Sequence, residues 1–180
     1  MPENQIKIFL SIFALMKKPL LFLLFLQFTV FVFAQTYTAK IIGITDGDTV
    51  SILFNNKRQV IRLAHIDTPE RNQPFGYKAK QFVSDRIFGK EVTVVIADRP
   101  DRNGRWIAEI FYKNQNINKE LVRNGLAWHF KRYSKNANYA ELEIQARKKK
   151  IGLWQESNPV EPWNWRNYKK RQNALLKKAS

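Results

Sequence analysis

The chain has 180 residues, 44% of them hydrophobic and 13% aromatic, which is enough apolar material to bury the core of a single domain. It contains no cysteine, which excludes a disulfide framework and a thiol nucleophile. The formal net charge of +16 favours a polyanionic partner, nucleic acid or an anionic membrane, although a solvated lysine surface is a simpler alternative that charge leaves open.

The N-terminal segment has the pattern of a secretory signal peptide. A basic start at Met16 (MKK) is followed by a short apolar run at 20–33. Val32 and Ala34 have the small side chains that signal peptidase accepts, so we expect cleavage before Gln35. Two alternatives are open: translation begins at Met16, or both apolar stretches form an uncleaved anchor. Cleavage would remove three lysines and one glutamate and leave a net charge of +14, with the mature protein exported to a periplasm or secreted.

Five short strands are predicted after the signal segment. Each is rich in β-branched and apolar residues, and turn-forming sequences such as TDGD, NNK and RNG separate them. The predicted strands span residues 37–44, 48–54, 58–66, 91–98 and 105–112. A helix is predicted between the third and fourth strands. This order matches an α+β fold built on a five-stranded OB-fold Greek-key β-barrel.

About three α-helices are expected to pack on the barrel. The first spans 76–89, where Ala79, Phe82, Val83 and Ile87 lie on one face at helical spacing. Two more are predicted at 118–125 and 139–152, and each of the three ends at a glycine.

The tail after Gly152 is rich in tryptophan and proline and is expected to dock on the core as an irregular segment. Beyond about Tyr168 a frayed or loose basic helix is expected. The predicted organisation is therefore a signal peptide at 1–34, an OB-fold domain at 35–166 and a basic C-terminal tail at 167–180.

Acidic side chains flank two of the predicted strands. Asp46 and Asp48 precede the second strand, and Asp67, Thr68 and Glu70 follow the third. A hairpin brings the start of one antiparallel strand beside the end of the next, so these carboxylates can meet. In such a basic chain, a hard divalent cation such as calcium or magnesium best explains meeting carboxylates. Taken alone, the DGD sequence is more typical of an ordinary turn.

Two arginines lie on the same predicted strands. Arg62 is on the third strand, and Arg105 begins the fifth after the DRNG turn. A guanidinium binds phosphate through two parallel hydrogen bonds and keeps its charge, although most arginines are surface ion-pair partners. His65 and His129 are isolated in the sequence, which favours packing or hydrogen-bonding roles over zinc ligation.

The sequence resembles the staphylococcal-nuclease-like, or thermonuclease, family. The motifs DGDTV, IRLAHIDTPE, FG followed by KAKQF, DRNGR, LVRNGLAW and GLW occur in the order and spacing of that family. The resemblance runs from about Tyr37 to Trp165. It implies a calcium-dependent, sugar-non-specific endonuclease that hydrolyses phosphodiester bonds of DNA and RNA and leaves a 3′-phosphate.

The resemblance also implies roles for six residues. Two calcium-binding carboxylates are Asp48 and Asp67, the backbone oxygen of Thr68 is a further ligand, and the catalytic residues are Arg62, Glu70 and Arg105. Glu70 is expected to act as the general base, and an alternative is that it orients the attacking water.

Departures from the family pattern concern contacts with bases. The loop after Glu70 is short, and Asn103 and Lys131 stand where family tyrosines would be. Tyr133 can retain one aromatic contact. Base preference and affinity are therefore less determined than phosphate chemistry, because stacking supplies much of single-strand binding.

Two other classes of function compete with the nuclease. A non-catalytic OB-fold module would bind nucleic acid without cleaving it, but both acids, both arginines and the glutamate are present. A cationic protein of membrane surfaces would need a basic helix richer in bulky apolar residues than 139–152. A monomer without stable membrane insertion after signal removal is expected.

Overall fold

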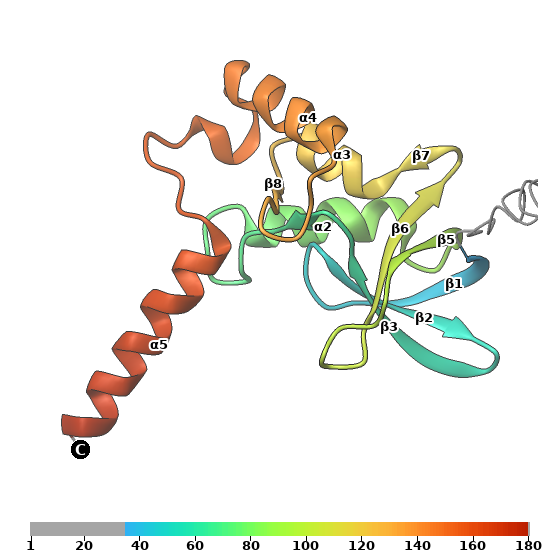
Figure 1. The fold of residues 1–180 in the computed structure, drawn as a ribbon, viewed down its shortest axis with the longest axis horizontal. Coiled ribbons are helices and arrows are strands. Elements are labelled where there is room, and N and C mark those ends of the chain that lie inside the picture. The colour runs from blue at the N-terminus through green and yellow to red at the C-terminus, as the bar shows by residue number, and fades with distance from the viewer. Residues whose placement is uncertain (1–34, 180) are drawn as a thin grey trace, which may run out of the picture. The chain divides into compact units, whose positions relative to one another are not determined.

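The computed structural model describes residues 35–179, so the predicted signal peptide lies outside the described residues. Within this part, five strands form a closed barrel in the order β3-β2-β1-β5-β6, and parallel pairing of β3 with β6 closes it (Figure 1). The barrel strands are β1 (Thr36–Ile44), β2 (Thr49–Phe54), β3 (Lys57–Leu63), β5 (Glu91–Asp98) and β6 (Trp106–Tyr112). The predicted α+β fold with a five-stranded OB-fold barrel is confirmed.

Helices and short strands make up the rest of the described chain. The short strands are β4 (Ile66–Asp67), β7 (Gln115–Asn116) and β8 (Trp128–His129). The helices are α2 (Gly76–Ile87), α3 (Ile117–Arg123), α4 (Ala137–Lys148), the 3₁₀ helix η1 (Gly152–Gln155) and α5 (Pro162–Ala179).

Helix α2 buries the face that its spacing predicts. Ala79, Val83 and Ile87 are fully buried, and Phe82 packs against the edge of the same core. The chain leaves the helix through Gly89, whose φ of 72° is the left-handed conformation that glycine adopts without strain. The core formed by this face and the inward strand residues holds the start of α2 against the turns that carry the acidic side chains.

The third strand is shorter than predicted. It was expected to reach Ile66, but β3 ends at Leu63 and His65 has a left-handed φ of 69°. The Ala64 N–H donates to the carbonyl of Ala108 at 2.8 Å, which completes the contact with β6 before the chain turns away. The acidic segment therefore leaves the barrel instead of continuing the ladder.

After this turn the acidic segment pairs with a distant part of the chain. β4 and β8 are antiparallel, with Ile66 opposite His129 and Asp67 opposite Trp128. Strands of two residues carry no alternating pattern, so the sequence did not predict either of them. The pairing fixes the backbone of Asp67.

The C-terminal segment is helical earlier than expected. An irregular segment was expected up to about Tyr168, whereas α5 begins at Pro162, a residue whose fixed φ suits the first turn of a helix. The helix passes through the boundary proposed at 166/167, which stays a prediction. No helix in residues 35–179 is long and apolar enough to cross a membrane.

Asn118 joins three parts of the fold. Its side chain is fully buried, accepts from the Ile110 N–H, and donates to the carbonyls of Ala64 and Ala108, each at 3.1 Å.

Asn118→Ala should lower the free energy of unfolding by roughly 2–3 kcal/mol, because buried backbone groups lose partners. Urea unfolding measures this. The exposed Asn138→Ala is the control, and equal stability of the two variants would contradict the prediction.

Candidate active site

The turn before β2 is held by close packing. The Asp48 N–H donates to Asp46 Oδ1 at 3.1 Å, and the Asp48 carbonyl accepts from Leu63 at 2.8 Å. A Cβ on Gly47 would lie 2.7 Å from Cβ of Ala79 in α2, so only glycine fits at this position. Asp48 is thus fixed against both β3 and α2.

Four of the six predicted site residues form one cluster. Arg62 makes ion pairs with Asp48 and with Asp67, the latter at 2.7 Å. The backbone N–H and the hydroxyl of Thr68 donate to Asp48 Oδ2 at 2.7 and 2.9 Å. Asp48 is 5% exposed and Asp67 1% exposed. The two predicted carboxylates therefore meet in a mostly buried site, as the hairpin argument required.

Charge is crowded at this cluster. Burial alone would raise the pKa of Asp48, but Arg62 and the two hydrogen bonds from Thr68 outweigh it and lower that pKa. Burial and the neighbouring charge of Asp48 raise the pKa of Asp46 to about 6. One ionised aspartate thus disfavours ionisation of the next, which is the expected behaviour of carboxylates gathered around a cation position.

Glu70 is positioned by its backbone. Its N–H donates to Gln73 Oε1 at 3.0 Å, and its carbonyl accepts from the Gln73 N–H at 2.8 Å. Gly76, at the start of α2, lies so close that an added Cβ would collide with the Glu70 carbonyl oxygen. The Glu70 side chain is 38% exposed. Gln73 and Gly76 were not among the predicted site residues, although the FG motif had marked the second.

Arg105 stands apart from the cluster. It immediately precedes β6, where the pairing of Trp106 with Ile61 places it beside the strand that carries Arg62. Its Nε and Nη2 contact Asp101 Oδ2 at 2.8 and 2.7 Å. Within residues 35–179, no hydrogen bond or ion pair joins Arg105 to the other predicted site residues. The side chain is 30% exposed and keeps access to solvent.

A third arginine reaches the site from α5. Arg166 Nη2 contacts Asp67 Oδ2 at 2.7 Å, and its Nη1 contacts Glu70 Oε1 at 2.5 Å. Arg166 was not among the residues predicted from the sequence. The only signal was the tryptophan-rich segment around it, which predicted docking on the core without indicating where.

Comparisons with known proteins point to one family. The model of the staphylococcal nuclease homologue family matches residues 60–156. An uncharacterized endonuclease of Haemophilus influenzae is 40% identical over 134 residues, which cover 74% of this chain and 75% of the relative. A micrococcal nuclease of Shigella flexneri is 37% identical over 145 residues, or 74% and 83% of the two chains.

The chain belongs to the staphylococcal nuclease family. It is a phosphodiester hydrolase, an endonuclease whose substrate is nucleic acid. The predicted resemblance and enzyme class are thereby confirmed. An uncharacterized endonuclease of Escherichia coli is also similar, at 35% identity over 131 residues and 72% of this chain.

The cluster has the donors that a family cation would need. Nucleases of this family are generally metal-dependent. Asp48, Asp67 and the backbone of Thr68 offer hard oxygen ligands, which suit calcium or magnesium. Within residues 35–179, no three His, Cys, Asp or Glu side chains come together as a metal cage. The predicted ligand set consists of two carboxylates and one backbone oxygen, so it does not require a third acidic side chain. The negative charge crowded at Asp46 and Asp48 favours a cation at this cluster.

Gly76 tests whether the backbone position of Glu70 matters for the nuclease. Gly76→Ala should displace the Glu70 carbonyl, reduce cleavage at least about 10-fold and lower stability by about 1–3 kcal/mol, the usual cost of overpacking. Initial rates on single-stranded DNA and urea unfolding measure both effects. Gly43→Ala is the matched control, because its Cβ would meet Ser51 only at 3.5 Å. Unchanged cleavage by Gly76→Ala would contradict this positioning.

Proposed function

We propose that this protein is a calcium-dependent, sugar-non-specific endonuclease that hydrolyses DNA and RNA at the cluster of Asp48, Asp67 and Glu70. The observation that supports the proposal most is the meeting of Asp48 and Asp67 on one guanidinium, that of Arg62. Two buried carboxylates at separate strand ends, with an exposed carboxylate nearby, form a binding site for a cation and a phosphodiester.

The oxygens of Asp48, Asp67 and the Thr68 backbone would hold the calcium ion. When bound there, calcium would supply Lewis-acid stabilisation of charge on the phosphate. The Thr68 hydrogen bonds keep Asp48 ionised and in one orientation. The pairing of β4 with β8 holds the backbone of Asp67 in one position.

The arginines bind the phosphate. Arg62 lies between the two acids, and its planar guanidinium stabilises negative charge as it builds on the phosphate oxygens. Arg105 is partly exposed in the turn before β6. To bind a phosphate, its guanidinium must exchange Asp101 for the substrate. Arg62, held between the two acids, and Arg105, once it exchanges Asp101 for the phosphate, together favour the five-coordinate transition state over the ground state.

Glu70 acts on water. Its exposed carboxylate accepts a proton from the attacking water as general base, or orients that water by a hydrogen bond. Gln73 and Gly76 fix the backbone beneath it, so the carboxylate varies only through its side-chain rotamers. This accounts for an acid held in a short proline turn.

The site favours low sequence preference. Its charged groups are suited to phosphate and to a cation, which carry no base information. The two tyrosine positions of the family are occupied by Asn103, which is exposed, and by Lys131, which pairs with Glu143 at 3.2 Å. Tyr133 is 73% exposed and available for stacking. Export to a periplasm or secretion as a monomer is part of this proposal and is supported by the signal-like sequence at 1–34.

Substitutions of the catalytic residues distinguish the nuclease from a non-catalytic nucleic-acid-binding module. Glu70→Gln and Arg105→Ala should each reduce cleavage of single-stranded DNA by about 10²-fold or more, because they remove the base and a charge aimed at the transition state. Thermal unfolding should stay near wild type, since both side chains are partly exposed. The exposed Glu91→Gln and Arg102→Ala are the controls. Near-normal rates from folded Glu70→Gln or Arg105→Ala would overturn the assignment.

Removal of divalent ions tests the cofactor. Treatment with a calcium chelator should abolish cleavage of DNA and RNA, and added calcium should restore it, whereas binding to a non-cleaved oligonucleotide should persist through the basic surface. End-group analysis of the products should find a 3′-phosphate. Undiminished cleavage after chelation would contradict the cation site, and restoration by magnesium alone would replace calcium as the ion.

A further inference from the structure

Arg166 covers Asp67, one of the two carboxylates that a cation would use. Its guanidinium forks onto Asp67, with Nη2 at 2.7 Å from Oδ2 and Nη1 at 3.3 Å from Oδ1, and it also contacts Glu70 at 2.5 Å. Asp67 therefore has Arg62 on one oxygen and Arg166 on both. Both side-chain oxygens of Asp67 are thus contacted by guanidinium groups, and the Glu70 carboxylate is paired with Arg166.

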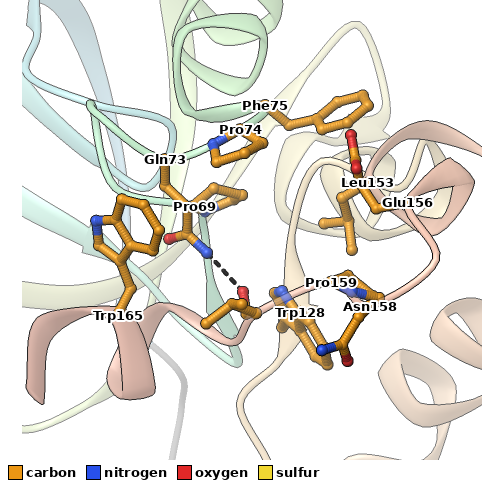
Figure 2. Close-up of a pocket in the computed structure, with 11 residues that line it drawn as sticks. Pro69, Gln73, Pro74, Phe75, Trp128, Leu153, Glu156, Asn158, Pro159 and Trp165 are labelled. Atoms are coloured by element: carbon orange, nitrogen blue, oxygen red, sulfur yellow. Dashed lines mark hydrogen bonds between the residues drawn. The ribbon is translucent and has the colours of Figure 1, made fainter. Parts of the chain in front are cut away.

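The start of α5 is docked to deliver this arginine. The Gln73 side chain, which also holds the Glu70 backbone, donates to the Val160 carbonyl at 2.5 Å, and Figure 2 shows Trp165 beside Pro69 and Gln73. Trp163 stacks on Phe130 with the ring centroids 5.3 Å apart. The first turn of α5 thus packs directly against the turn that carries Glu70.

The rest of α5 has few such contacts. Tyr168, Leu175 and Leu176 are between 61% and 67% exposed, and the helix leads away from the barrel in Figure 1. The residues from Lys169 to Arg171 are exposed as well. A helix attached mainly through its first turn can swing away at modest cost once the Arg166 contacts are broken.

A cation and Arg166 oppose one another at Asp67. Two positive charges held against the same carboxylate repel strongly where water is excluded, and Asp67 is 1% exposed. Arg62 is shared between Asp48 and Asp67, so Arg166 supplies the remaining positive charge that offsets the buried carboxylate of Asp67 when no cation is bound. Each partner therefore weakens the binding of the other, and the coupling is reciprocal.

We propose that Arg166 is a further active-site residue, and that it and the divalent cation are alternative partners of Asp67. In the metal-free protein, α5 covers the site. Cation binding displaces Arg166, frees Glu70 for water and releases the first turn of α5. The inference rests on the proposed cation site, but Arg166 lies beyond the stretch at 60–156 that matches the family model.

Calcium binding to Arg166 variants tests the proposal. Isothermal titration calorimetry with calcium chloride should find tighter binding by Arg166→Gln than by the wild-type protein, by a factor of about 5–150, the usual range of coupling between sites. Arg166→Lys, which keeps the charge without the forked geometry, should lie between the two. Lys170→Gln is the control, because it removes the same charge from α5 at an exposed position and should leave the affinity unchanged.

Hydrogen exchange supplies a second readout that is independent of cleavage. In the chelator-treated wild-type protein, the amides of residues 163–172 should be protected, and saturation with calcium should increase their exchange. In Arg166→Gln these amides should exchange faster without calcium and respond little to it. Equal calcium affinities, or α5 amides unchanged at saturating calcium, would overturn the competition. Failure of both proteins to bind calcium would instead overturn the cation site, and the competition with it.

Discussion

The site is organised by one guanidinium shared between two buried carboxylates. Arg62 bridges Asp48 and Asp67, which come from the turn before β2 and the segment after β3, at the open end of one hairpin. Removing Arg62 would take from Asp48 the guanidinium that offsets its buried charge, so the position of both carboxylates depends on this one residue. The barrel brings β2 and β3 into register, and the shared charge holds their turns together at the edge.

Packing around this ion-pair cluster also fixes the backbone of Glu70, the residue proposed to act on water. Helix α2 presses on the site from two sides, with Ala79 against Gly47 and Gly76 against the Glu70 carbonyl. Both contacts need glycine, because an added Cβ would collide with the Ala79 side chain at position 47 and with the Glu70 backbone at position 76. The same helix is anchored by its buried face, so core packing and the position of Glu70 are parts of one structure.

The C-terminal helix α5 lies outside the stretch that matches the family model, yet it contacts this site. Gln73 holds the Glu70 backbone on one side and the Val160 carbonyl on the other. Arg166 then completes the charge balance at Asp67. The positive charge of Arg166 offsets part of the repulsion between the crowded carboxylates.

Much of this protein could be predicted from local pattern. Runs of β-branched and apolar residues between turn sequences predicted the five barrel strands. Helical spacing predicted the face of α2 through Ala79, Val83 and Ile87, and the order of the elements predicted the OB-fold barrel. The meeting of Asp48 with Asp67 also followed, since hairpin geometry relates one strand start to the next strand end. These features depend on periodicity and on neighbours in the chain, which a sequence records directly.

Only the tertiary structure decided the remaining contacts. The early end of β3 depends on Asn118, a residue of α3, and on Ala108 of β6. The β4–β8 pair and the helical start of α5 depend on distant partners, and Arg166 meets Asp67 across 99 positions. Such contacts are set by how packed elements meet in space, and no local pattern specifies them. The sequence by itself thus determined the barrel and the acids, while packing decided which charges surround them.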